Sequence, residues 1–502
     1  MDFLTLFIVI PVLTIFGIVI AKSHNQVRWT AAVGSSISLV LAAILIFRYL
    51  AERHAGNVSE FIFTADYLWY PSFNIRYTIG VDGISAAMIG LTSIVVFTGI
   101  FASWEVEYRQ KEFFVTLILL AGGVFGFFIT TDLFTMFLFY ELAVIPMYLL
   151  IGIWGSGPKE YSAMKLTLML MGASALLVVG ILGLYFNSAP DGGQFTYNIL
   201  EIAKVHIPVE TQKFFFPFLF IGFGVLGAMF PFHTWSPDGH SSAPTAVSML
   251  HAGVLMKLGG YGCFRVAMFL LPEAAHELGW IFLVLVTISV VYGAFGAIMQ
   301  KDLKYINAYS SVSHCGLVLF ALLMMNRTAM DGAIMQMISH GIMTALFFAL
   351  IGMIYGRTHT RNIYEMGGLM RVIPFLGVAY VVGGLASLGL PGFSGFVAEM
   401  LVFVGSWQHV DTFHRVATII ACSSIVITAV YILRVVGQLI FGPVKEEWFH
   451  ELNDAKWFEK LSVGTLIIGI AGIGLAPLWL SDMISVSLGP IVERLDMVTL
   501  IH

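Results

Sequence analysis

PFHTWSPDGHSSAPTAVSMLHAGVLMKLGGYG, from Pro231 to Gly262, is the stretch of the sequence that decides the fold. It contains a proline-rich interruption, three histidines and Lys257, and long apolar runs lie on both sides of it. Interrupted backbone and an isolated ammonium group are both costly inside a lipid bilayer. A membrane-spanning chain that carries both therefore invites a functional interpretation of this stretch.

The composition is that of a polytopic helical membrane protein. Of the 502 residues, 58% are hydrophobic and only 11% are charged, whereas soluble domains have about 25% charged residues. Apolar runs of about 20 residues recur along the whole chain, as transmembrane helices require. The first run, 3–21, is too long for a signal-peptide core and lacks a basic start, so we expect a retained span. The net charge of −5 suggests no nucleic-acid partner.

We expect an all-α fold with about 14 membrane spans and no soluble domain, so that residues 1–502 form a single integral membrane domain. Spans seven and twelve contain Pro and Gly interruptions, and we expect both to be discontinuous helices. The expected spans lie near residues 3–21, 29–50, 85–103, 113–130, 132–153, 162–187, 214–230, 243–268, 279–299, 305–325, 330–355, 372–407, 414–441 and 461–482.

The distribution of Lys and Arg predicts the orientation of the chain. The loops after odd-numbered spans hold about twice as many of these residues as the loops after even-numbered spans. Because cytoplasmic loops are rich in Lys and Arg, we expect both termini outside, with a bacterial cytoplasmic membrane as the location.

A weak internal repeat indicates where transport would occur. The interruption in span seven has a counterpart, LGLPGFSGFVAEM, at 388–400 in span twelve, and an apolar helix follows each one. Paired interrupted spans in the two halves of a chain are typical of a transporter binding region.

Ionisable residues within the expected spans are few, so each one is informative. Glu141 lies midway along span five, Lys257 lies midway along span eight, and Glu399 follows the second interruption. Burial moves the proton affinity of such groups towards neutral pH, and we interpret all three as proton carriers. The alternative for Glu141 and Lys257 is a structural ion pair with a neighbouring helix.

His314 and His340, in spans ten and eleven, are candidates for relaying protons between Lys257 and Glu399. Imidazole gains and loses a proton near physiological pH, which suits a relay. The alternative is that each histidine is a hydrogen-bonded packing residue.

Cofactor and metal signals are missing from the sequence. Cys263, Cys315 and Cys422 lie far apart in apolar segments, so we expect neither a zinc site, nor an iron–sulfur cluster, nor a disulfide. The G-x-G-x-x-G pattern at 222–227 lies inside an apolar run with no preceding strand and does not predict a dinucleotide site. We therefore expect no cofactor and no metal ion in this chain.

At these residues the sequence resembles the antiporter-like membrane subunits of respiratory complex I and of Mrp-type cation/proton antiporters. The resemblance covers nearly the whole chain, and several matching pieces are long and follow the family's order. Its strongest pieces are GVDGIS (80–85), the span around Glu141, the opening stretch 231–262, KDLKYINAYSSVSHCGLV (301–318), QMISHGIMTALFF (336–348) and LPGFSGFVAEM (390–400).

The resemblance implies two inverted five-helix repeats, formed by spans 4–8 and 9–13. The implied divisions are N-terminal helices at 1–112, a first repeat at 113–268, a second repeat at 279–441, and a C-terminal loop and helix at 442–502. It also implies a proton pathway through the membrane midplane, made by Glu141, Lys257, His314, His340 and Glu399.

Within the family, the chain most resembles the NuoM-type subunits, because it has Glu399 in span twelve. The other antiporter-like subunits of complex I typically carry lysine at this position. The resemblance then implies a membrane-arm subunit of proton-translocating NADH:quinone oxidoreductase, conducting protons that are coupled to quinone reduction elsewhere. Its partners would be other membrane-arm subunits, including neighbouring antiporter-like ones. Flavin, iron–sulfur clusters and quinone would belong to partner subunits, and this chain would hold no redox centre.

The chain departs from the family just before the opening stretch. Family members usually carry a lysine five residues before Pro231, where this chain has Leu226, so Glu141 lacks its expected partner. Lys165, about one turn inside the cytoplasmic edge of span six, and His233 are candidate substitutes. For Lys165 the alternative is that its ammonium group simply reaches the membrane surface.

A second departure lies in span eight. His251 occupies a position where we expect an apolar residue, and it would add a base near Lys257. The alternative functions are a subunit of a Mrp-type antiporter or of a related membrane-bound hydrogenase, or a structural module that does not pump, as Leu226 suggests. A stand-alone solute carrier is not favoured, because no polar residues cluster like a substrate cage.

Overall fold

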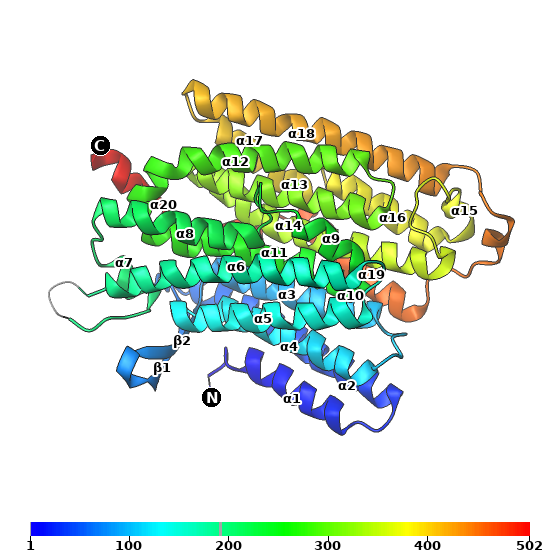
Figure 1. Cartoon of the computed structure of the whole chain (residues 1–502), viewed down its shortest axis with the longest axis horizontal. Coiled ribbons are helices and arrows are strands. Elements are labelled where there is room, and N and C mark those ends of the chain that lie inside the picture. The colour runs from blue at the N-terminus through cyan, green and yellow to red at the C-terminus, as the bar shows by residue number, and fades with distance from the viewer. Residues whose placement is uncertain (1, 190–192, 502) are drawn as a thin grey trace.

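The structure is a computed structural model that describes residues 2–189 and 193–501. Long helices run side by side and form one bundle, with a small β-hairpin at one end (Figure 1). In chain order the elements are α1 (Leu6–Ile20), α2 (His24–His54), β1 (Ile62–Tyr70), β2 (Ile75–Val81), α3 (Gly83–Ala102), α4 (Gln110–Ile129), α5 (Leu133–Trp154), α6 (Lys159–Phe186), α7 (Ile199–Ala203), α8 (Val209–Leu226), α9 (Trp235–Ser242), α10 (Thr245–Leu250), the π-helical turn η3 (His251–Leu255), α11 (Met256–Gly262), the π-helical turn η4 (Cys263–Met268), α12 (Pro272–Met299), α13 (Leu303–Leu323), α14 (Arg327–Thr358), α15 (Leu369–Val372), α16 (Pro374–Ser387), α17 (Ser394–Trp407), α18 (Thr412–Val436), α19 (Trp457–Leu475) and α20 (Leu478–Ile501).

The described residues include 11 helices that are long and apolar enough to cross a membrane, and α1, α16 and α17 are shorter apolar helices. The predicted helical membrane fold is confirmed, but long helices alone do not reach the expected number of spans. One reason is that the expected span 243–268 winds through α10, η3, α11 and η4, whose π-helical turns interrupt the regular helix.

Both predicted interruptions are present. The first half of span seven, α8, ends at Leu226, and the chain becomes helical again only at Trp235, where α9 begins. In span twelve, α16 ends at Ser387 and α17 begins at Ser394. The division into repeats at 113–268 and 279–441 stays a prediction.

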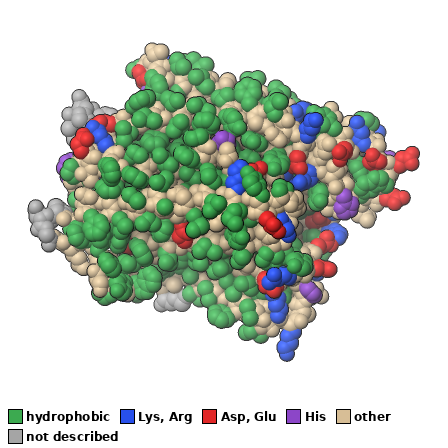
Figure 2. Space-filling view, in the orientation of Figure 1, with side chains coloured by type: hydrophobic (Ala, Val, Ile, Leu, Met, Phe, Trp, Pro, Cys, Tyr) green, Lys and Arg blue, Asp and Glu red, His purple; other side chains and the backbone are tan. Residues whose placement is uncertain are grey.

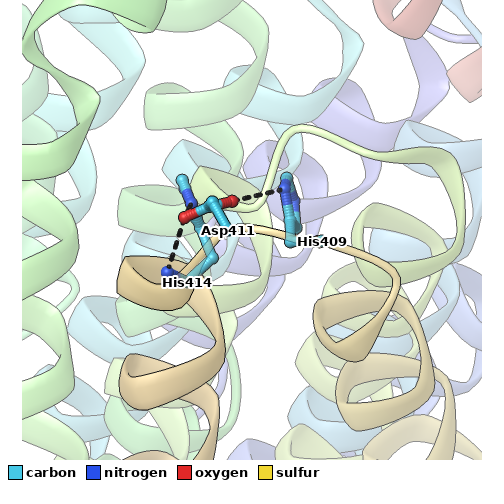
Figure 3. A group of neighbouring side chains, drawn as sticks. All are labelled: His409, Asp411 and His414. Atoms are coloured by element: carbon cyan, nitrogen blue, oxygen red, sulfur yellow. Dashed lines mark hydrogen bonds and ion pairs between the residues drawn. The ribbon is translucent and has the colours of Figure 1, made fainter.

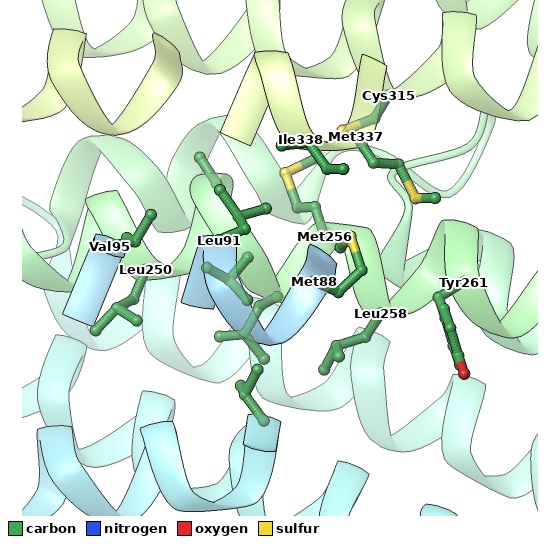
Figure 4. Packing of buried hydrophobic residues seen from close by; sticks show 14 of the residues in the cluster. Met88, Leu91, Val95, Leu250, Met256, Leu258, Tyr261, Cys315, Met337 and Ile338 are labelled. Carbon is green, nitrogen blue, oxygen red and sulfur yellow. The ribbon is translucent and has the colours of Figure 1, made fainter. Parts of the chain in front are cut away.

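The middle of the bundle is formed by α3, α13 and α14, which are almost completely buried, whereas in α2, α18 and α19 fewer than half of the residues are buried. Figure 4 shows α3 packed against the α10–α11 segment, with α13 and α14 on the other side of that segment. Side chains of this core include Met88, Leu91, Val95, Leu250, Met256, Leu258, Tyr261, Cys315, Met337 and Ile338. The segment that carries Lys257 is therefore enclosed by protein and shielded from lipid.

The surface fits an embedded bundle. On the face in Figure 2, hydrophobic side chains cover the middle of the molecule, and most charged side chains lie towards the end that carries α15. A broad apolar belt of this kind is what a membrane-spanning surface requires.

Two elements were not predicted. The segment 52–84, expected to be a polar loop, contains the antiparallel pair β1–β2, whose aromatic and β-branched residues favour strands. The last expected span, 461–482, ends earlier as α19, and α20 is a separate helix that packs on α3, α12 and α14. Both elements lie at the end of the bundle where the chain terminates (Figure 1).

Candidate functional site

Four of the predicted site residues form a continuous polar row through the middle of the bundle. Lys257 Nζ lies 2.8 Å from His340 Nδ1. The His340 and His314 rings stack with their centroids 5.1 Å apart. His314 Nδ1 lies 3.7 Å from Glu399 Oε1. The four side chains come from α11, α14, α13 and α17, so the tertiary fold brings together groups that the sequence separates.

The local helix geometry holds Lys257 at the inner end of the row. The preceding turn, η3, is π-helical, and such turns are frequent at functional sites. Lys257 is 1% exposed. Its Nζ also donates a hydrogen bond to the carbonyl oxygen of Ala252, five residues earlier. A carbonyl oxygen and an imidazole nitrogen are both neutral acceptors, so these contacts position the ammonium group without an ion pair.

The Glu399 carboxyl group packs against Gly389, in the interruption between α16 and α17. Gly389 has a φ of +61°, and a Cβ there would lie 2.7 Å from Glu399 Oε2. A Cβ at this position would displace the carboxyl group, and the positive φ is itself a backbone conformation that L-residues avoid. Glu399 and His314 line a small cavity whose other polar side chains are hydroxyls, those of Ser313, Ser387, Ser424 and Thr428.

Gln336 fixes the orientation of the His314 ring. Its Nε2 lies 3.0 Å from His314 Nδ1, and its Oε1 is buried without a hydrogen-bond partner in the described chain. A 180° turn of this amide would place an acceptor where the donor now stands. The pair can therefore accommodate His314 with or without a proton on Nδ1.

Glu141, the fifth residue of the predicted pathway, lies apart from this row. It is partly buried on α5, and Ser174 of α6 donates a hydrogen bond to Oε1 of Glu141. The suggested pairing with Lys165 is not present, because Lys165 Nζ lies 2.7 Å from Asp238 Oδ2. Ser174 and Lys165 are nine residues apart on α6, about 14 Å along a helix, so one carboxylate cannot serve both.

His233, the other candidate substitute, packs between aromatic rings. Its ring centroid lies 4.8 Å from that of Tyr292 and 5.7 Å from that of Phe230. No contact with Glu141 is found in the described part of the chain. Leu226 itself is completely buried at the end of α8.

His251 has a neighbour that the sequence analysis did not single out as a site residue. The rings of His251 and His240 lie 4.2 Å apart, and His251 also stacks on Trp235 at 5.1 Å. Both histidines are completely buried, and within the described residues none of their ring nitrogens has a hydrogen-bond partner.

Lys304 falls in the loop expected between spans 279–299 and 305–325, and its predicted place among the loop cations is wrong. It is 5% exposed near the start of α13, and its Nζ donates a 2.6 Å hydrogen bond to the carbonyl oxygen of Ala243. The helix α13 begins at Leu303 and is capped by Asp302, so Lys304 belongs to the helix and not to the loop before it.

Asp82 and Arg265 form a second buried polar feature that sequence reasoning missed. An Arg265 guanidinium N–H donates to Asp82 Oδ2, and both side chains are less than 5% exposed. Asp82 belongs to the GVDGIS motif and caps α3, accepting a hydrogen bond from Ser85 N at 2.8 Å. An arginine within an expected span was the available signal.

Comparison with known proteins identifies the family of this chain. The model of the NADH:quinone oxidoreductase/Mrp antiporter transmembrane family matches residues 130–428. The chain is 38% identical over 443 residues to NAD(P)H-quinone oxidoreductase chain 4 3 of Picosynechococcus sp., which covers 87% of this chain and 79% of that protein. It is 34% identical over 481 residues to NAD(P)H-quinone oxidoreductase chain 4 1 of Microcystis aeruginosa, with coverages of 94% and 90%.

Solved structures share the fold. A chain of respiratory complex I from Thermus thermophilus with bound NADH superposes with a TM-score of 0.88 at 22% identity, covering 98% of this chain and 99% of that one. A chain of the Mrp complex from Dietzia sp. gives a TM-score of 0.79 at 18% identity and covers 98% of each chain. The matched region 130–428 contains the whole row from Lys257 to Glu399. The chain is therefore a multi-span integral membrane protein that belongs to the NADH:quinone oxidoreductase/Mrp antiporter transmembrane family.

Proposed function

We propose that this chain is a NuoM-type membrane-arm subunit of a proton-translocating NADH:quinone oxidoreductase. The observation that carries the proposal is the row from Lys257 to Glu399, which supplies ionisable groups at close spacing across the enclosed part of the bundle. The names of relatives such as NAD(P)H-quinone oxidoreductase chain 4 3 support the redox-linked member of the family.

In this proposal the chain's own residues move protons and carry no electrons. Lys257 passes a proton directly to His340 Nδ1 across 2.8 Å. The two imidazoles stack face to face and share no hydrogen bond, so transfer from His340 to His314 needs a ring rotation or a bridging water. Glu399 receives the proton from His314 and releases it towards the outer face. Flavin, iron–sulfur clusters and quinone reside in partner subunits.

Protons would reach Lys257 along the buried cations and histidines on its other side. The candidates are Lys304, whose Nζ reaches the Ala243 carbonyl oxygen, and the buried His240–His251 pair. Lys165 and Asp238, a half-buried ion pair, would form the entrance. Replacing His251 with leucine is expected to slow proton uptake by the intact complex. Unchanged proton translocation in that variant would remove His251 from the pathway.

The proposed setting is a bacterial cytoplasmic membrane with both chain termini outside. Neighbouring membrane-arm subunits, including antiporter-like ones, would pack against the apolar flanks. Purification of the intact complex through a tag on this chain tests the assignment. Recovery with flavin- and iron–sulfur-containing subunits would support it, and recovery with small antiporter subunits alone would overturn it.

The pathway is tested by Lys257→Met in the assembled complex, with proton translocation measured per NADH oxidised. Translocation through this chain is expected to be lost, whereas Lys204→Met, at a lysine with 69% of its side chain exposed, is expected to change nothing. Unimpaired translocation in Lys257→Met would exclude the row. Leu226 favours a second candidate, a family member that transmits the coupling signal without pumping. In that case Lys257→Met would impair assembly or turnover but not the proton yield.

A further inference from the structure

The connection between α17 and α18 carries a group of metal-binding side chains in the sequence His-Val-Asp-Thr-Phe-His. His409, Asp411 and His414 each present one ligand atom, and these atoms lie within 4.8 Å of one another. Figure 3 shows the Asp411 carboxylate beside both imidazole rings, which stack on each other with their centroids 4.3 Å apart. Their side chains are between 26% and 48% exposed, so an ion from solution can reach them.

A backbone contact fixes the tautomer of His409. Its Nε2 lies 2.7 Å from the carbonyl oxygen of Met324, and a carbonyl only accepts, so Nε2 carries the hydrogen. Asn326 Nδ2 lies 3.2 Å from the same nitrogen and donates instead to the carbonyl oxygen of Gly405. The other ring nitrogen, Nδ1, then keeps a free lone pair that faces Asp411. Metal-binding histidines are held in this way, with the second ring N–H donated to a carbonyl or carboxylate.

The spacing suits a small divalent ion. Ligand atoms bound tetrahedrally to Zn²⁺ lie about 3.3 Å apart, given bonds of about 2.0–2.1 Å. His409 Nδ1 lies 3.8 Å from Asp411 Oδ1, and His414 Nδ1 lies 2.7 Å from Asp411 Oδ2. The three ligand atoms lie within 4.8 Å of one another, so a small shift of the side chains would bring them to this spacing around one ion. A metal ion would replace the proton that His414 now shares with the carboxylate.

The chemistry of the donor set selects the class of ion. Two imidazole nitrogens and one carboxylate oxygen suit zinc and its late-transition neighbours better than Mg²⁺ or Ca²⁺, which prefer oxygen ligands. Arg415 is the nearby cation, but its Nε donates to the carbonyl oxygen of His409 at 2.9 Å and its guanidinium lies over the Trp407 ring. Its charge is therefore turned away from the ligand atoms.

We propose that His409, Asp411 and His414 form a binding site for a divalent transition-metal ion of the zinc class, with one coordination position left to water. The site ties the end of α17 to the start of α18, and through Met324 it touches the end of α13. Because α13 and α17 carry His314 and Glu399, the bound ion would restrain the helices at the outer end of the polar row. The binding itself does not depend on the proposed proton pathway. From the sequence we expected no metal site in this chain, and none of these three residues was a predicted ligand.

Zn²⁺ binding to the purified full-length chain in detergent tests the proposal, with competition against a chromogenic zinc chelator as the measurement. Wild type is expected to bind one ion per chain. His409→Ala and His414→Ala are each expected to weaken binding at least tenfold. His54→Ala, at an exposed histidine on α2, is the matched control and is expected to leave binding unchanged.

Asp411 requires a separate variant because it also caps α18, accepting a hydrogen bond from His414 N at 3.0 Å. Asp411→Asn keeps the cap and removes the anionic ligand, so it should weaken zinc binding while leaving thermal stability without metal unchanged. Substitution of Co²⁺ for Zn²⁺ should give the visible absorption of a tetrahedral ion in wild type only. Equal zinc affinity in wild type and both histidine variants, or no stoichiometric binding, would overturn the proposal.

Discussion

Replacing Asp82 with asparagine is expected to lower the free energy of unfolding by about 3–5 kcal/mol, the usual cost of stranding one member of a buried ion pair. Arg265 cannot avoid this cost by losing its proton, since a guanidinium stays charged in proteins. Its side chain is 4% exposed and lies against the rings of Phe61, Tyr261 and Phe264, none of which carries a negative charge that could balance the guanidinium group. Asparagine caps a helix as well as aspartate does. The loss of stability would therefore come from the unpaired charge of Arg265 and not from a lost helix cap.

The measurement is reversible unfolding in mixed micelles, followed by circular dichroism. A loss of 3–5 kcal/mol corresponds to a change of about 100- to 5000-fold in the folding equilibrium constant. Asp66→Asn is the matched control, because the Asp66–Arg76 pair is exposed and such pairs contribute about 0–1 kcal/mol. Adding Arg265→Met to Asp82→Asn should restore much of the stability, since an apolar replacement leaves no buried charge. The reasoning would be refuted if the free energy of unfolding of Asp82→Asn lay within about 1 kcal/mol of wild type. It would also be refuted if the double variant were no more stable than Asp82→Asn.

Gly389→Ala should displace the Glu399 carboxyl group, because the new Cβ would lie 2.7 Å from Oε2. Proton translocation by the complex should fall, whereas Gly464→Ala, whose Cβ would meet nothing within 4 Å, should have no effect; equal loss in both variants would contradict this account. In the hairpin, hydrogen bonds from Arg76 hold the pKa of Asp66 below its usual value. A lowered folded-state pKa stabilises the hairpin above the unfolded-state pKa of about 4, and this contribution is lost as the pH falls through the folded-state pKa. Nuclear magnetic resonance of the hairpin should therefore show fraying in strong acid, and Arg76→Ala should remove that pH dependence; fraying of equal size in both proteins would argue against the pair.

The polar row was predictable because each of its members stands out locally. Lys257 and Glu399 are charges within apolar runs, and His314 and His340 lie in serine-containing turns of apolar helices. Such residues are rare enough in a membrane span that each one attracts attention without any knowledge of its neighbours. Their order along the row also followed from the resemblance to a known family.

Features that depend on tertiary pairing were not predictable in the same way. Asp82 and Arg265 are separated by 183 positions in the sequence, and nothing local links them. Lys304 was misplaced because the boundary of its helix was uncertain by a few residues, and one turn decides whether a lysine is a loop cation or a buried group. The hairpin was missed because nine residues of strand carry too little apolar alternation to stand out beside long helices.

The family resemblance implies one pathway that joins Glu141 to the row from Lys257 to Glu399. Because this chain has Leu226 in place of the expected lysine, Glu141 and the row are separate parts of the site. Glu141 accepts a hydrogen bond from Ser174, and the position that usually carries lysine in the family is occupied by the buried, uncharged Leu226. The row beyond Lys257 needs none of these groups, since its contacts run to His340 and onwards. A signal from Glu141 must therefore reach Lys257 through helix movement or through the field across a low-dielectric interior, in which a charge acts over longer distances than in water. In the proposed pathway, proton conduction and its control would accordingly be carried by different residues, and substitutions at Glu141 and at Lys257 should have different consequences.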